Sequence, residues 1–94
     1  MKESAIQKKI IEYIKNINGD CFKITATSRR GCPDLIALVS GRMILIEVKK
    51  EGKQLDSLQK YFFDIWNYKK LNCIKVSSIR DLESGLIDMG IYRV

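Results

Sequence analysis

The sequence predicts a single α/β domain, residues 1–94, in which a mixed central sheet is flanked by helices in the order αβββαβα. Isoleucines recur at helical spacing near the N-terminus, and two β-rich runs in the middle of the chain are separated by a two-residue turn. A second helical pattern then precedes a short last strand. No Pro- or Gly-rich linker, repeat or low-complexity segment divides the sequence, and 94 residues suffice to bury one core.

The first predicted helix runs from Glu3 to Ile17. Its buried stripe repeats every three or four residues and consists of Ile6, Ile10, Ile14 and Ile17. Glu3 projects from this buried face, so two interpretations of Glu3 stay open. It either serves a site beneath the helix or only favours the positive helix N-terminus, where Ser4 and Gln7 also have capping-box spacing.

A β-hairpin is predicted after a strand over Asp20–Thr27 and an accessible loop over Ser28–Pro33. Its strands are the apolar run Leu35–Val39 and the β-rich run Met43–Val48, joined by a serine–glycine pair at 40–41 that suits a tight turn. Because both faces of the hairpin are largely apolar, we expect it to be central in its sheet and covered on both sides.

The register of this hairpin gathers charged side chains. With a two-residue turn, Leu38 pairs with Met43 and Asp34 with Glu47, and strand alternation places Lys49 on the face of Glu47. Opposed residues have Cβ atoms roughly 4.5–5.5 Å apart, so two carboxylates there repel by about 3 kcal/mol at an effective dielectric near 20. A divalent cation such as Mg²⁺ converts that repulsion into coordination. A turn aspartate and a solvated strand end explain each residue alone but not their pairing within an apolar hairpin.

A second helix is predicted over Leu55–Tyr68, with an inner stripe formed by Leu58, Phe62, Ile65 and Trp66. Asp56 and Gln59 in its first turn have the spacing of a capping box. We interpret the aromatic residues of this helix as core or subunit interface, in preference to platforms for stacking bases. A strand over Cys73–Val76, parallel to the preceding strand, and a helix over 78–87 complete the prediction.

Composition excludes several kinds of chemistry. The sequence has no histidine, which removes Ser-His and Cys-His triads, histidine-based zinc sites and nucleases with a histidine base. Its three cysteines lack paired metal-ligand spacing and are typical of reduced thiols in a cytoplasmic protein. No run reaches transmembrane length and the N-terminus does not resemble a signal peptide, so we expect no membrane partner. The net charge of +6 favours a polyanionic partner, with Arg29 and Arg30 as the strongest candidates for contact.

The same residues resemble a known group of nucleases. A Pro-Asp pair at 33–34 followed by Glu-Val-Lys at 47–49 resembles the PD-(D/E)XK signature. The resemblance narrows to the VRR-NUC (virus-type replication-repair nuclease) family in four segments, namely Glu3-Ser4-x-Ile6-Gln7, Gly31–Leu35, Ile46–Lys49 and Leu55–Gln59. It implies a restriction-endonuclease-like fold and a metal-dependent DNA endonuclease that acts as a homodimer on four-way junctions or flaps. Archaeal-type Holliday junction resolvases share the PD…E-x-K core and are a second resemblance.

The resemblance also implies residue roles. The implied ligands for Mg²⁺ or Mn²⁺ are Asp34, Glu47 and the backbone carbonyl of Val48, with Glu3 as an additional or water-mediated ligand. The implied catalytic residues are Asp34, Glu47, Lys49 and Gln59. Lys49 would orient the attacking water or stabilise developing negative charge, and Gln59 would position Lys49 or the water. The residues expected to contact DNA are Arg29, Arg30, Lys50 and Lys53.

Two other classes of protein stay open. A catalytically silent module that binds nucleic-acid junctions for a partner explains the basic charge but not the acidic cluster. A structural or interaction protein uses the aromatic helix as a dimer face, and it lacks the steep salt dependence of phosphate binding. No organic cofactor is expected, and the expected setting is DNA repair or recombination in the cytoplasm of a bacterial or phage-infected cell.

Overall fold

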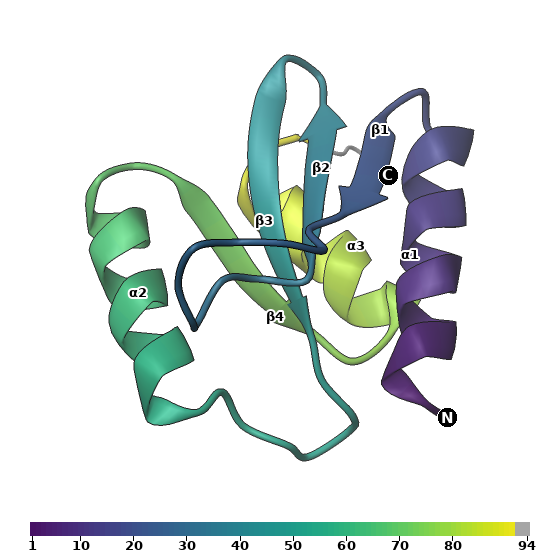
Figure 1. The fold of residues 1–94 in the computed structure, drawn as a ribbon. Helices are drawn as coiled ribbons and strands as arrows, with labels where there is room; N and C mark the ends of the chain where they lie inside the picture. Colours follow the sequence, from purple (N-terminus) through teal and green to yellow (C-terminus); the bar gives the residue numbers. More distant parts are fainter. Residues whose placement is uncertain (92–94) are drawn as a thin grey trace.

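The computed structural model describes residues 1–91 as a four-stranded sheet with helices on both faces (Figure 1). In chain order the elements are α1 (Glu3–Asn16), β1 (Asp20–Lys23), β2 (Leu35–Val39), β3 (Arg42–Val48), α2 (Ser57–Tyr68), β4 (Asn72–Val76) and α3 (Ile79–Asp88). The predicted order αβββαβα is confirmed. Strands β1, β2 and β3 are antiparallel neighbours, whereas β4 runs parallel to β3 because α2 crosses over between them.

One face of the sheet carries the main core. Helices α1 and α3 pack there, and the isoleucine stripe of α1 is confirmed, since Ile6, Ile10 and Ile14 are all buried. The two helices pack against every second residue of β2 and of β3, and these strand residues point to the same face of the sheet. A smaller cluster on the opposite face joins Phe63 of α2 to Leu45 of β3 and to β4. The hairpin is therefore central in the sheet, as predicted.

The predicted hairpin register is confirmed. Leu38 pairs with Met43 and the ladder continues to Leu35 and Ile46. The two turn residues, Ser40 and Gly41, both have positive φ values, 51° and 76°, the pattern of a type I′ turn. Such a turn matches the right-handed twist of the strands and fixes which residues face each other.

Strand β1 is shorter than predicted, since it ends at Lys23 and not at Thr27. The N–H of Ile24 still donates to the carbonyl of Asp34 at 2.8 Å. Because β2 begins only at Leu35, the residues after Ile24 have no strand partner and enter the loop instead.

The prediction that both faces of the hairpin are covered is wrong at its tip. Leu38 and Met43 are each 43% exposed, because α2 packs against the β3–β4 side of the sheet and leaves this corner open. The predicted inner stripe of α2 is also partly wrong. Leu58 is exposed, and Phe63 is the α2 residue that is fully buried in the sheet contact.

The three cysteines are free, as predicted from their number and spacing. Within residues 1–91, no helix combines the length and the apolar character needed to cross a membrane. The predicted last helix is confirmed, with the Ser78 hydroxyl accepting the N–H of Asp81 at 3.1 Å as its N-terminal cap.

Candidate active site

Asp34 is fixed by the backbone of the neighbouring strand. It lies one residue before the first pair of the β2–β3 ladder, and its N–H donates to the carbonyl of Ile46 at 3.1 Å. Its carboxylate oxygen Oδ2 accepts the N–H of Val48 at 2.9 Å. These two partners flank Glu47 in β3, so Asp34 lies beside Glu47, as the register predicts.

Glu47 and Lys49 are buried on the same side of β3. Their exposed fractions are 4% and 8%, and they are the buried charged residues of the part of the chain that the structure describes. The Lys49 Nζ atom lies 3.7 Å from Oε2 of Glu47, as strand alternation predicts. Burying two charges this deeply is costly, and it stabilises a fold only when every polar atom finds a good partner.

Gln59 connects the start of α2 to this pair. Its N–H donates to Oδ1 of Asp56 at 2.9 Å, and its side-chain oxygen accepts the N–H of Asp56 at 3.0 Å, which completes the predicted capping box. The amide nitrogen of the same side chain donates to Oε2 of Glu47 at 3.0 Å. Gln59 therefore caps the helix and contacts the site at the same time. The amide reaches Glu47, whereas the sequence favoured Lys49 or a water as its partner.

The second oxygen of Glu47 lacks a partner. Oε1 is buried, and no hydrogen-bond donor among residues 1–91 reaches it. Burial and, next, the neighbouring charge of Asp34 raise the pKa of Glu47 from 4.5 to about 7, against the opposing effects of Lys49 and Gln59. Only additional positive charge or a proton would offset both causes.

The residues present fit a hard divalent cation. Among residues 1–91, no three carboxylate or thiol groups converge on one point, so a cation here would take Asp34 and Glu47 as its acidic ligands. A main-chain oxygen, as predicted for Val48, and waters would complete its shell, an arrangement that Mg²⁺ commonly adopts. The unpartnered Oε1 atom of Glu47 is the polar atom that such a cation would satisfy.

Glu3 contacts the segment that follows Lys49. Its Oε2 atom accepts the N–H of Lys50 at 3.1 Å and lies 3.8 Å from Nζ of Lys53. It does not form a three-residue acidic group with Asp34 and Glu47. The observed contacts tie the start of α1 to the segment that leaves β3 directly after Lys49.

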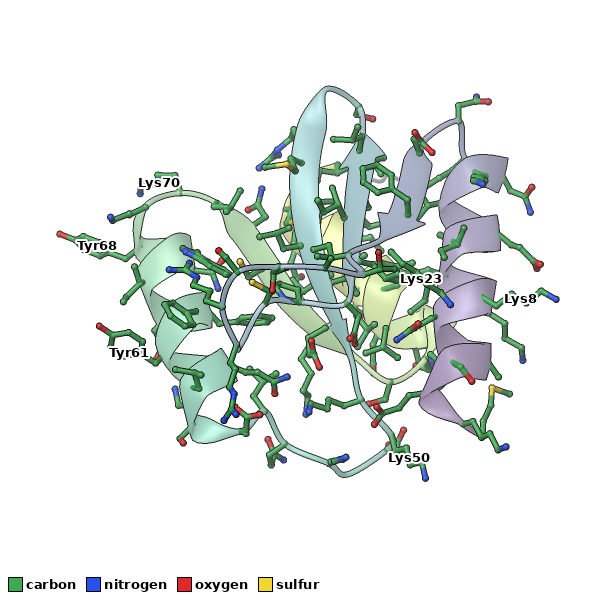
Figure 2. The ribbon with its side chains drawn as sticks, in the orientation of Figure 1. Lys8, Lys23, Lys50, Tyr61, Tyr68 and Lys70 are labelled. Atoms are coloured by element: carbon green, nitrogen blue, oxygen red, sulfur yellow. The ribbon has the colours of Figure 1, made fainter. Side chains whose placement is uncertain are left out.

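The four predicted DNA-contacting residues, Arg29, Arg30, Lys50 and Lys53, are all exposed. Figure 2 shows Lys50 at the beginning of the segment after β3, with its side chain pointing away from the sheet. Lys8 and Lys70, which belong to the other basic groups of the sequence, lie at opposite sides of the molecule in the same view. The excess of positive charge is therefore spread over several surfaces.

The loop that carries Asp34 is docked on α2, a contact that the sequence analysis missed. It crosses in front of β3 toward α2 before it returns to β2 (Figure 1). Gly31 has a φ of +85°, and a Cβ atom there would lie only 2.9 Å from Cδ2 of Phe62 and 3.1 Å from Cγ of Leu58. The Arg29 guanidinium carbon lies 4.1 Å from the centroid of the Phe62 ring. Helix α2 therefore supports both Asp34, through the loop, and Glu47, through Gln59.

The fold and the site together indicate which class of protein this chain resembles. A mixed sheet that presents Asp34, Glu47 and Lys49 from one hairpin, with Gln59 entering from the next helix, is the arrangement of the PD-(D/E)XK superfamily. A solved structure described as a VRR_NUC domain superposes with a TM-score of 0.80 and 27% identity, over 92% of this chain and 94% of that one. In fold and over most of its length, the chain is therefore similar to a VRR_NUC domain.

A comparison by sequence gives a second relative. Over 55 residues the chain is 34% identical to "Putative nuclease p44" of Acyrthosiphon pisum secondary endosymbiont phage 1. That alignment covers 57% of this chain and 59% of the relative, so the chain spans little more than half of that protein's length. No family model matches the sequence.

Proposed function

We propose that this protein is a divalent-metal-dependent DNA endonuclease that hydrolyses phosphodiester bonds. The observation that supports it best is the buried carboxylate of Glu47, which keeps one oxygen unpartnered beside Asp34 and an ammonium group 3.7 Å from the other oxygen. Such a cluster gives the fold little stability. It does supply what phosphodiester hydrolysis needs, namely a place for a cation and a buried donor of positive charge.

In the proposed mechanism each residue has one task. Asp34, held by the Val48 N–H, and Glu47, held by Gln59, would be the acidic ligands of the cation. When bound there, Mg²⁺ or Mn²⁺ supplies polarisation of the scissile phosphate and a bound water of lowered pKa. The Lys49 ammonium orients that water or stabilises the negative charge that develops on the phosphate oxygens.

The proposed substrate is branched DNA, a four-way junction or a flap, met in repair or recombination in the cytoplasm of a bacterial or phage-infected cell. The net charge of +6 and the exposed arginines of the Asp34 loop support a polyanionic substrate. A four-way junction has two equivalent strands to cut, whereas each chain has one cluster of this kind among its described residues. We therefore propose that a homodimer resolves junctions.

A cleavage assay tests the proposal. Labelled four-way junction, flap, linear duplex and single strand are incubated with Mg²⁺ or Mn²⁺, beside a Glu47→Gln variant that keeps the shape of the side chain. We expect symmetric nicks at the junction by the wild type, none by the variant, and no cleavage in EDTA. Cutting confined to flaps would keep the nuclease and change its substrate. Tight junction binding without any cutting would replace the proposal by a silent binding module.

A further inference from the structure

A pocket of about 220 Å³ opens beside the proposed reaction centre. Residues 24–27, residues 31–34 and Arg29 line it. Asp34 is one of the lining residues, so the pocket adjoins the acidic pair. A water molecule takes up about 30 Å³ in the liquid, so this space holds a group far larger than a single ion. The proposed cation site leaves the pocket unused.

Arg29 is held in place without its donors being used. Its guanidinium carbon lies 4.1 Å from the centroid of Phe62 and 5.3 Å from that of Trp66, and these two rings stack at 5.5 Å with planes 21° apart. The Thr27 hydroxyl donates to the Arg29 carbonyl at 2.7 Å and fixes the backbone. Among residues 1–91, no hydrogen bond or ion pair engages the guanidinium itself, although the side chain is exposed. Its outer face and its N–H groups are thus free for a ligand.

The surroundings of Arg29 favour a flat ligand. Tyr61 packs edge-on against Phe62, with ring centroids 5.3 Å apart and planes at 70°, and it is 59% exposed. Figure 2 shows Tyr61 projecting from α2 away from the sheet. Guanidinium planes and aromatic rings are the surfaces on which proteins stack unpaired bases. Bases inside a duplex are already stacked on each other and offer no free face to such a surface.

We propose that an unpaired base of the DNA substrate enters this pocket and stacks on the outer face of the Arg29 guanidinium. The inference rests on the proposed function for its substrate class and adds that an unpaired nucleotide lies next to the phosphate that is cut. Phe62 and Trp66 are positioning residues that hold Arg29 from below. The sequence analysis interpreted these aromatic residues as core or interface, and their contact with Arg29 gives them this further role.

Trp66 allows a direct test, because it is the only tryptophan of the sequence and lies against Arg29. Its fluorescence is followed while the full chain, without divalent metal, is titrated with an oligothymidylate, an abasic oligonucleotide of equal length and a blunt duplex. We expect a saturable change with the oligothymidylate and binding roughly ten-fold or more weaker for the abasic strand, which keeps the phosphates but has no bases. Equal affinity for both strands, or tighter binding of the duplex, would overturn the proposal.

Two variants separate stacking from charge. Arg29→Lys keeps the charge and removes the guanidinium plane, so it should weaken oligothymidylate binding several-fold or more and leave the abasic strand little changed. Arg30→Ala removes one charge from an exposed neighbour and should weaken both strands to the same modest extent. A loss of base preference in Arg30→Ala but not in Arg29→Lys would contradict the assignment. Because binding is measured without metal, a chain that fails to cleave would still answer this question.

Discussion

Replacing Glu47 by glutamine should change how stability depends on pH. The wild-type carboxyl is buried, and its pKa is raised from 4.5 to about 7 by burial and by Asp34. Ionising this group therefore destabilises the folded protein relative to the unfolded chain. At 1.36 kcal/mol per pKa unit, the cost amounts to about 3 kcal/mol above pH 7.

Stability falls as the pH rises because the pKa of Glu47 is raised in the folded protein. Below pH 4.5 Glu47 is protonated in both states and contributes no penalty. As the pH rises through the window from 4.5 to about 7, the unfolded chain loses this proton before the folded chain does, so the wild type loses stability. The Glu47→Gln protein shares every other ionisable side chain with the wild type. The difference between the two proteins isolates the contribution of Glu47.

Urea unfolding of the wild type and of Glu47→Gln is measured in EDTA at several pH values between 4 and 8.5. The midpoints of the two proteins at each pH give the difference in their unfolding free energies. Relative to the wild type, Glu47→Gln should gain about 2 to 3 kcal/mol of unfolding free energy between the two ends of the range. A difference that is flat with pH, or that falls as the pH rises, would refute the claim that Glu47 is a strained, buried acid.

Three further predictions concern the groups around Glu47. Gln59→Ala should lower stability by up to about 1 kcal/mol, because it loses one of the two hydrogen bonds of the capping box, and it should also lower single-turnover cleavage. Asp56→Ala loses the other bond of the box but keeps the Gln59 amide, so it should be slowed less, and equal slowing would argue against a role for that amide. Gly31→Ala should lower the melting temperature more than Gly41→Ala. Both glycines have positive φ, but of the two only at Gly31 would the added Cβ atom lie 2.9 Å from the Phe62 ring, so equal losses would refute the tight docking of the loop. Lys49→Met should slow cleavage roughly 10²–10³-fold while calorimetry still detects metal binding, and near-normal cleavage would remove Lys49 from the mechanism.

Local rules were sufficient for the parts of this fold that depend on neighbours in sequence. The two-residue turn fixed the hairpin register, and the register together with strand alternation brought Asp34, Glu47 and Lys49 together. The capping box of α2 was equally visible in the spacing of Asp56 and Gln59. Each of these predictions needed only the period of a strand or the geometry of one turn.

Contacts between segments that are distant along the chain could not be predicted from the sequence. The docking of Gly31 on Phe62 depends on where α2 lies relative to the loop, and no periodicity encodes that distance. The same placement explains why Leu58 is exposed, since the helix meets the sheet at Phe63 and meets the loop at Phe62 and Trp66. A glycine in the loop before Asp34 and the aromatic residues of the later helix were the available signal, and without a three-dimensional arrangement Gly31 indicated only a loop.

The proposed function requires that Asp34 and Glu47 together hold a divalent cation. The most direct measurement is a crystal structure of the protein soaked in Mn²⁺, with an anomalous difference map calculated at the manganese edge. We predict a peak in direct contact with the carboxylate of Asp34 and with Oε1 of Glu47, the oxygen that lacks a partner. An empty site at saturating Mn²⁺, with Glu47 Oε1 bonded to a protein group or a water, would contradict it.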